Sequence, residues 1–270
     1  MQTILPESVL LGSVVGIAFA LTGAGGTIIA VPLLIFGLHL AIADAAPIAL
    51  LAVGVSAATG ALLALKQGKV RYRAASLLAL AGLVASPLGV FLAQKIPDTF
   101  LVLLFAIVLG YAALYTFRQS RRNPAEGAVN SSAPCQLTPG GYLIWTWLCA
   151  RMMTMAGVLA GFLSGLLGVG GGFIIVPALQ KITNLHVHSI IPTSLAAIAL
   201  ISLAGSTSAM VMRGMNWAIA LPFTFGAGTG MLLVSTFIHR FTGPRLQQGF
   251  AILAGCVSIG MIICQIQNLL

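Results

Sequence analysis

The chain has 270 residues, of which 59% are hydrophobic and only 6% are charged. This composition excludes an ordinary soluble domain and indicates a protein that crosses a membrane several times. Its 13 lysines and arginines exceed its 4 aspartates and glutamates, which gives a formal charge of +9. In a membrane protein such an excess reflects orientation and contact with anionic lipid, so we expect the lipid bilayer, and no nucleic acid, as a partner.

The first apolar run covers residues 8–38 and is interrupted by glycines. One helix of that length would measure roughly 46 Å, whereas the hydrocarbon core is about 30 Å thick. Gly23, Gly25 and Gly26 lie inside the run and Pro32 follows them. Because glycine and proline both weaken a helix, we expect a helix, a break at these glycines and a second half-helix.

Further spans follow in chain order. The first half continues with apolar segments at about 41–65, 74–94 and 99–117, and the second half has segments at about 150–179, 187–212, 217–238 and 246–268. We expect an all-α polytopic membrane protein. It divides into an N-terminal membrane repeat (1–118), a polar, mobile cytoplasmic linker (119–140) and a C-terminal membrane repeat (141–270).

The two halves carry the same sequence pattern. A shift of 145 residues pairs seven glycines of the first half with glycines of the second, where roughly one or two coincidences would arise by chance. Gly12 and Gly16 fall on Gly157 and Gly161, and their spacing of four permits close helix contact. The break is duplicated too, since Gly23, Gly25, Gly26 and Pro32 fall on Gly168, Gly170, Gly171 and Pro177.

Two topologies fit this pattern. If each broken segment spans the membrane, the chain has about eight transmembrane segments, nine basic residues face the cytoplasm against four, and both termini are cytoplasmic. If each broken segment enters and returns on one side, six spans and two re-entrant segments form inverted repeats. Eleven basic residues then face the cytoplasm against two, and the C-terminus lies outside. Charge counting leaves both topologies open.

The duplicated breaks are the predicted substrate site. Unwound backbone in a bilayer is tolerated where it lines a cavity or is buried in protein, and paired broken segments are typical of transporter sites. Free N–H groups at the half-helix N-termini favour an anion. The predicted substrate-binding residues are Thr22, Gly23, Gly25, Gly26, Thr27, Gly168, Gly170, Gly171, Gly172, Thr193 and Ser194. Other candidate hydroxyls nearby are Ser56, Thr59, Ser164, Ser206 and Thr207.

A simpler interpretation competes with this one. The glycines could serve helix packing alone, and each hydroxyl could satisfy its own backbone. For any individual serine or threonine this structural interpretation is the stronger one. Duplication of the break together with its proline favours a site for the pair as a whole.

No catalytic, cofactor or metal site is predicted. The sequence has no P-loop, no HExxH and no paired carboxylates within a span, so we expect neither ATP hydrolysis nor enzymatic activity. His186 and His188 alone are weak evidence for a metal, and Arg151 is interpreted as an interfacial residue. We expect free thiols at the four cysteines, Cys135, Cys149, Cys256 and Cys264.

These features resemble the sulfite exporter TauE/SafE family of membrane transporters. The resemblance rests on the motif pair, the four-segment halves, the basic hairpin at 66–73 and the length, and it covers the chain apart from 119–140. The run Gly168-Val-Gly-Gly-Gly172, with Thr193-Ser194 later, is a close match. In the first half Thr27 replaces the third glycine, and Ile48-Ala49 stand where the second half has Thr193-Ser194. The departures imply an asymmetric site with more polar contacts from the second half.

The resemblance implies a multi-pass transporter of the inner (plasma) membrane. Its substrate would be a small anion, a sulfur-containing oxyanion or organosulfonate such as sulfite, thiosulfate or sulfoacetate. We expect a secondary transporter that works by alternating access between the repeats, with proton coupling plausible from the family. The alternative is a non-transporting membrane scaffold or assembly protein, which would not require a break in both halves. Substrate, direction, coupling ion and oligomeric state are left open by the sequence.

Overall fold

The structure is a computed structural model that describes residues 4–22, 26–68, 70–121, 135, 146–184, 187–237 and 244–267. Over these residues the fold is helical, and its one β-bridge joins Cys135 to Thr183. The prediction of an all-α protein is confirmed. The helices are α1 (Ile4–Thr22), α2 (Gly26–Leu38), α3 (Ile42–Lys66), α4 (Tyr72–Ala93), α5 (Asp98–Arg121), α6 (Trp147–Leu167), α7 (Gly172–Ile182), α8 (Val187–Arg213), α9 (Trp217–Phe237) and α10 (Pro244–Gln267).

Six helices within the described ranges, α3, α4, α5, α6, α8 and α9, are long and apolar enough to cross a membrane. Their outer faces are apolar as well. On α4, Leu80, Val84 and Leu88 are 65%, 74% and 61% exposed, although Leu78 on the opposite face is fully buried. A helix that is hydrophobic all round needs an apolar surrounding, which the bilayer supplies. The prediction of a polytopic membrane protein is therefore confirmed.

Each glycine-broken segment folds back on itself. In the first hairpin Gly26 of α2 packs on Phe19 of α1, and Gly37 at the far end of α2 packs on Leu11 near the start of α1. The second hairpin, α6 with α7, is closed at its base through Cys135, whose N–H donates to the Ile182 carbonyl at 3.1 Å. This geometry favours the six-span alternative over eight continuous spans.

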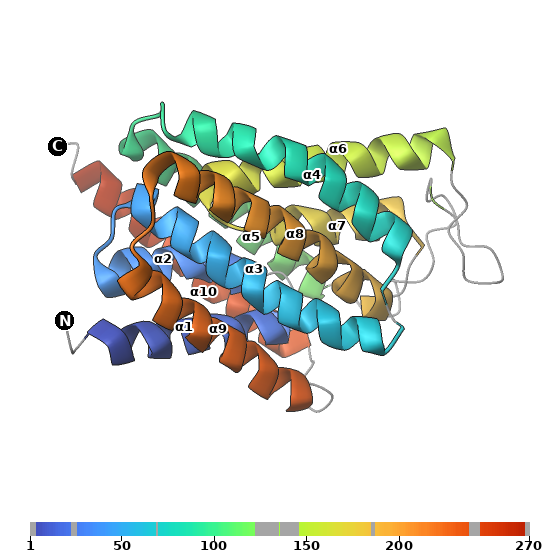
Figure 1. Cartoon of the computed structure of the whole chain (residues 1–270), viewed down its shortest axis with the longest axis horizontal. Coiled ribbons are helices and arrows are strands. Elements are labelled where there is room, and N and C mark those ends of the chain that lie inside the picture. The colour runs from blue at the N-terminus through green and yellow to red at the C-terminus, as the bar shows by residue number, and fades with distance from the viewer. Residues whose placement is uncertain are drawn as a thin grey trace.

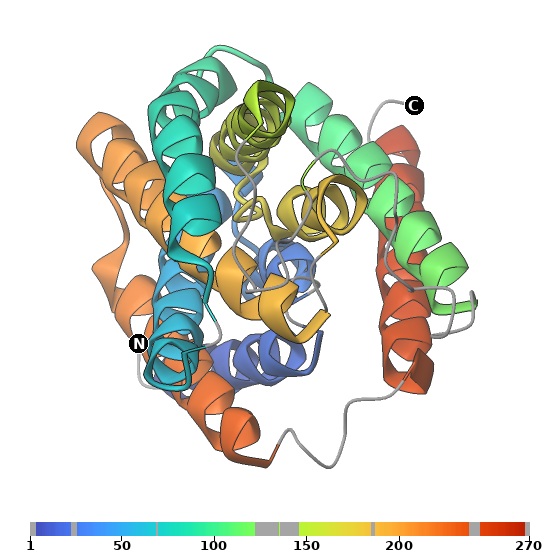
Figure 2. The ribbon, with the colours of Figure 1, turned by 90° about the vertical axis from the view of Figure 1, so that its right-hand side faces the viewer.

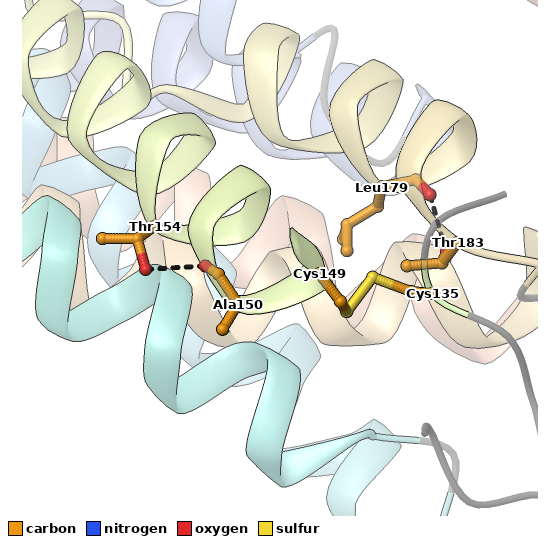
Figure 3. Close-up of a disulfide and its surroundings, with 6 residues drawn as sticks. All are labelled: Cys135, Cys149, Ala150, Thr154, Leu179 and Thr183. Atoms are coloured by element: carbon orange, nitrogen blue, oxygen red, sulfur yellow. Dashed lines mark hydrogen bonds between the residues drawn. A yellow bond between two sulfur atoms is a disulfide. The ribbon is translucent and has the colours of Figure 1, made fainter. Parts of the chain in front are cut away.

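The base of the second hairpin also contains a disulfide, which corrects the expectation of free thiols. Cys135 is bonded to Cys149 near the start of α6, and it pairs with Thr183 at the end of α7. Figure 3 shows the three residues together. Both cysteines are buried, at 0% and 1% exposure. Cys256 is free and exposed. The rest of the predicted mobile linker, 122–134 and 136–140, lies outside the described residues.

The helix contacts follow the 145-residue shift. Helix α1 packs most closely on α9, and the equivalent pair, α6 with α4, is also in close contact. The shift likewise exchanges the pair α3–α9 with α8–α4, and it maps α3–α8 and α5–α10 onto themselves. The halves therefore interleave, since each hairpin packs along a helix of the other half.

The paired glycines make this interleaving possible. Gly12 and Gly16 of α1 press against the backbone of α9 at Phe223 and Ala227, leaving no space for a Cβ atom. Gly157 and Gly161 of α6 do the same on α4. The predicted close helix contact at these glycines is confirmed.

The two hairpins lie in the middle of the molecule. Figure 2 shows them between the α5–α10 pair on one side and α3, α4, α8 and α9 on the other. Helix α1 begins and α10 ends at one end of the molecule, whereas the turn between α3 and α4 lies at the opposite end (Figure 1).

Candidate functional site

The second glycine turn joins α6 to α7 through left-handed backbone. Gly168, Gly170 and Gly171 have φ angles of 75°, 73° and 68°, a region that glycine adopts without the steric cost of a side chain. The Gly168 N–H closes α6 by donating to the Ser164 carbonyl at 2.9 Å. Gly171 then begins α7, and its carbonyl accepts the N–H groups of Ile174 and Ile175, both at 3.1 Å. The turn thus directs the N-terminus of α7 into the interior of the protein.

The first turn is closed by a side chain. The Thr22 hydroxyl donates to the Ala18 carbonyl at 2.6 Å and accepts the Gly26 N–H at 3.0 Å. Thr22 therefore caps α2 and leaves one fewer free donor at this turn. Gly23 and Gly25 lie outside the described residues, as does the side chain of Thr27.

Thr193 and Ser194 are buried on α8, where their hydroxyls bond to the protein itself. Thr193 donates to the Ser189 carbonyl at 2.6 Å and accepts the Arg71 N–H at 3.1 Å. Ser194 donates to the Ile191 carbonyl at 2.8 Å. Thr193 fastens the turn between α3 and α4 to α8, so it has a structural task in this conformation. Substrate contacts from these two residues stay a prediction.

A different group of hydroxyls lies close to the second turn. Ser86 of α4, Ser164 of α6 and Ser202 of α8 are each 0% exposed, and none has a hydrogen-bond partner among the described residues. The buried hydroxyls of Ser56 and Thr224 also lack a partner among the described residues. Most buried hydroxyls are bonded, so these positions call for a partner. The sequence pointed to Ser164 through its place before the break, but gave no signal for Ser86 or Ser202, which lie inside long apolar helices.

The interior of the described helices carries no charged side chain. Three carboxylates, Glu7, Asp44 and Asp98, are exposed in the first turns of α1, α3 and α5. Arg151 is exposed in the second turn of α6, beside a surface groove that Trp147 also lines. Any donor that the buried part offers to a ligand is therefore a neutral N–H or O–H group.

The tips of the two hairpins meet in an apolar contact. Ile28 of α2 meets Val169 and Phe173 of the second hairpin against α5, around a cavity of about 10 Å³. That volume holds at most one water molecule. The conformation is therefore one in which the tips seal against each other and against α5.

Metal ligands are not clustered in the described part of the chain, where no group of three or more His, Cys, Asp or Glu side chains converges. His39 follows α2 with a φ of 52°, a conformation common just after a helix. His186, His239 and the side chain of His188 lie outside the described residues.

Comparisons with known proteins agree with this architecture. The family model described as "Sulfite exporter TauE/SafE" matches residues 8–261, which include both hairpins. A probable membrane transporter protein from Xylella fastidiosa (strain Temecula1) is 30% identical over 93% of this chain and 92% of its own length. The probable membrane transporter protein YunE from Bacillus subtilis (strain 168) is 26% identical over 92% of this chain and 94% of its own. No solved structure matches.

Proposed function

Because the chain belongs to the TauE/SafE sulfite exporter family, we propose that it is a secondary transporter for a small sulfur-containing oxyanion or organosulfonate. Sulfite, thiosulfate and sulfoacetate represent this class. The family and the apolar spans make it a multi-pass membrane transporter of the plasma membrane. Substrate class and transport mechanism are the proposed part.

The observation that carries the proposal is the α6–α7 turn. Its three left-handed glycines direct the start of α7 into the protein interior. The first N–H groups of a helix have no intrahelical acceptor and carry the positive end of the helix dipole, so they favour an anion. Gly172 at the start of α7 is buried, and a glycine lets a substrate approach the backbone closely.

A neutral site fits an anion that must be released. A buried lysine or arginine would hold an anion tightly, whereas N–H and O–H dipoles bind it more weakly and without a permanent counter-charge. The described helix interiors have only such dipoles. Weak binding of this kind supports a transport site, from which the anion is released, rather than a site that retains it.

Alternating access is supported by the hairpin arrangement. The hairpins enter from opposite ends of the molecule, as Figure 1 shows, and their tips meet at a small apolar contact with α5. Separation of one hairpin from α5 would open the interior to one side while the other hairpin keeps it closed. Broken helices at the interface of two repeats are used in this way by other secondary transporters.

The energy source follows from what the sequence contains. It has no nucleotide-binding motif, so we expect no ATP hydrolysis by this chain and propose that an ion or substrate gradient drives the flux. Among the described residues no carboxylate is buried. If a proton is coupled, it travels on the anion itself or on a group outside these residues.

Flux measurements in liposomes test the proposal. Purified protein is reconstituted, and electrogenic flux is recorded for sulfite, thiosulfate, sulfoacetate, sulfate and chloride, with and without a pH gradient, against protein-free liposomes. We expect a saturable response to at least one sulfur anion and not to chloride. Folded, inserted protein that moves none of the sulfur anions would contradict the proposal and favour the scaffold alternative.

A further inference from the structure

The 145-residue shift pairs hydroxyl residues around one hairpin with apolar residues around the other. The reverse exchange also occurs, at Ser56 with Ile201 and at Thr224 with Ala79. On the side of the α6–α7 hairpin, four such hydroxyls lie on three helices, α4, α6 and α8. The pairs are Ser164 with Phe19, Ser86 with Met231, Ser202 with Ala57, and Ser206 with Ala61.

The packing shows that the paired residues occupy equivalent places. A Cβ atom at Gly205 of α8 would lie 2.7 Å from the Ser86 hydroxyl oxygen. A Cβ atom at Gly60, the equivalent glycine of α3, would meet the terminal methyl group of Met231. The fold therefore forms the same niche twice, once lined by a hydroxyl and once by a methionine.

The hydroxyl niche is connected to the second glycine turn. Gly165, the neighbour of Ser164, packs on the Ser86 backbone carbonyl, while Ser202 lies one helical turn before Gly205. Helices α4, α6 and α8 thus meet at this niche. It extends to α3, where the Ser206 hydroxyl donates to the Pro47 carbonyl at 3.4 Å. Ala46, next to that proline, contacts Gly168 of the turn.

The equivalent niche at the first hairpin is filled. Phe19 and Met231 are 1% and 4% exposed, and the Gly26 backbone packs directly on Phe19. The Thr22 hydroxyl already bonds to Ala18 and Gly26. Two unpartnered hydroxyls, those of Ser56 on α3 and Thr224 on α9, remain on this side, but Phe19 and Met231 occupy the positions that are equivalent to Ser164 and Ser86.

From these observations we propose that the chain has a single oxyanion site, in the niche beside the α6–α7 turn. The hydroxyls of Ser86, Ser164 and Ser202 donate to the anion there, and Phe19 and Met231 block the mirror position at the α1–α2 hairpin. Three neutral donors from three helices match the several acceptor oxygens of a sulfite- or sulfonate-type group. This inference rests on the proposed function and adds the position, the donors and a stoichiometry of one anion per chain.

Substitutions test the donors, with matched changes in the mirror niche. Ser86→Ala, Ser164→Ala and Ser202→Ala are compared with Ala57→Ser, the mirror of position 202. A further control is Ser258→Ala, which removes a buried hydroxyl bonded to the Ala106 carbonyl at 2.7 Å. For each variant the KM is measured in liposomes with sulfite, or with the anion of highest flux. The melting temperature of the anion-free protein and the number of labelled anions bound at saturation are measured as well.

Each niche hydroxyl should matter for the anion but not for the fold. Loss of one donor to an anion should raise the KM roughly tenfold or more. Because the three hydroxyls lack partners, their alanine variants should melt at the wild-type temperature or above it, whereas Ser258→Ala should melt about 2–4 °C lower. Ala57→Ser should leave the KM unchanged. Wild-type protein should bind one anion per chain.

The outcomes separate this inference from the function on which it depends. Wild-type flux with an unchanged KM in all three alanine variants would refute the hydroxyl site and leave the transporter intact. Two bound anions per chain would refute the blocked mirror niche. Loss of fold in the alanine variants would show that the hydroxyls are structural. A wild-type protein that neither binds nor moves any sulfur anion would refute the function and the site together.

Discussion

Glycine serves two separate purposes in this chain. At Gly161 the φ angle is helical, and the missing side chain lets α6 press on the backbone of Gly82 in α4. At Gly168, Gly170 and Gly171 the backbone is left-handed. The repeat pattern identified both groups, since each recurs at the same shift. The spacing of four marked the packing glycines, but the sequence left open whether the clustered glycines serve packing or a turn, because glycine satisfies both.

The packing role leads to a first prediction. Gly161→Val would place a branched side chain where the α4 backbone already lies, so the protein should lose stability or fail to assemble. Gly260→Val on α10 is the matched control, because a Cβ atom there meets nothing within 4 Å. Expression in membranes and the melting temperature of the purified protein report the difference. Equal behaviour of the two variants would contradict the packing role.

Site residues could be predicted only where local sequence determines their place. The glycine turn is local, and its position follows from the interrupted apolar run. Ser86 precedes Ser164 by 78 residues. It reaches the niche only because α4 packs on α6. The motif match predicted a ligand contact for Thr193, whose hydroxyl accepts the Arg71 N–H in this structure, so that contact stays a prediction.

The half-helices are the elements that decide the topology. Helix α2 has 13 residues and α7 has 11, which correspond to about 20 Å and 17 Å, well below the roughly 30 Å of the hydrocarbon core. The breaks and the lengths could be read from the sequence. The direction of the chain after each break could not, because it depends on contacts such as that of Gly37 with Leu11.

The disulfide at the base of the second hairpin gives a second prediction. Cys135 and Cys149 are 14 residues apart in the sequence. A disulfide that closes a loop of this length stabilises the fold by about 3 kcal/mol. Replacing both cysteines with serine should lower the melting temperature, whereas Cys256→Ser, at the exposed free thiol, should not. Maleimide labelling of the unfolded, unreduced protein should modify two of the 4 cysteines. Modification of all of them would contradict the bond.

Charge is segregated along the whole molecule. The described carboxylates lie in the first turns of α1, α3 and α5, which all begin at the same end of the molecule (Figure 1). Eight described basic residues belong to segments at the other end; they are Lys66, Arg71, Arg73, Arg118, Arg121, Arg151, Lys181 and Arg245. Under the positive-inside rule that end faces the cytoplasm.

The disulfide lies at this same basic end, although disulfides are rare in the cytoplasm. The two indications of orientation therefore disagree. We give more weight to the charges, because they sum over eight described residues, whereas the two cysteines are 0% and 1% exposed and so shielded from cytoplasmic reductants.

The orientation gives a third prediction. A reporter fused after Leu270 should lie outside the cell, because α10 ends at the end opposite the basic loops. A reporter inserted in the linker at 122–134 should lie in the cytoplasm. Paired alkaline phosphatase and fluorescent protein fusions at both places measure this. A cytoplasmic C-terminus would contradict the hairpin topology and restore the eight-span model.

Interleaving is the feature of the whole molecule that the sequence concealed. The duplication indicated two like halves, and a simple division into two bundles would have satisfied it. The structure instead pairs α1 with α9 and α6 with α4, so neither half completes its own helix packing. Which helices pair depends on which backbone fits against the glycine surface of each helix. A local sequence pattern does not contain that information.

Counterflow tests the central claim, that this family member carries a sulfur oxyanion by alternating access. Liposomes containing the protein are loaded with unlabelled sulfite and diluted into a trace of labelled sulfite. An alternating-access carrier exchanges the two, so the label should accumulate transiently above its external concentration and then decline. Labelled sulfite that only equilibrates would indicate a channel, and label that stays outside would show that this chain does not move sulfite; either result would contradict the account.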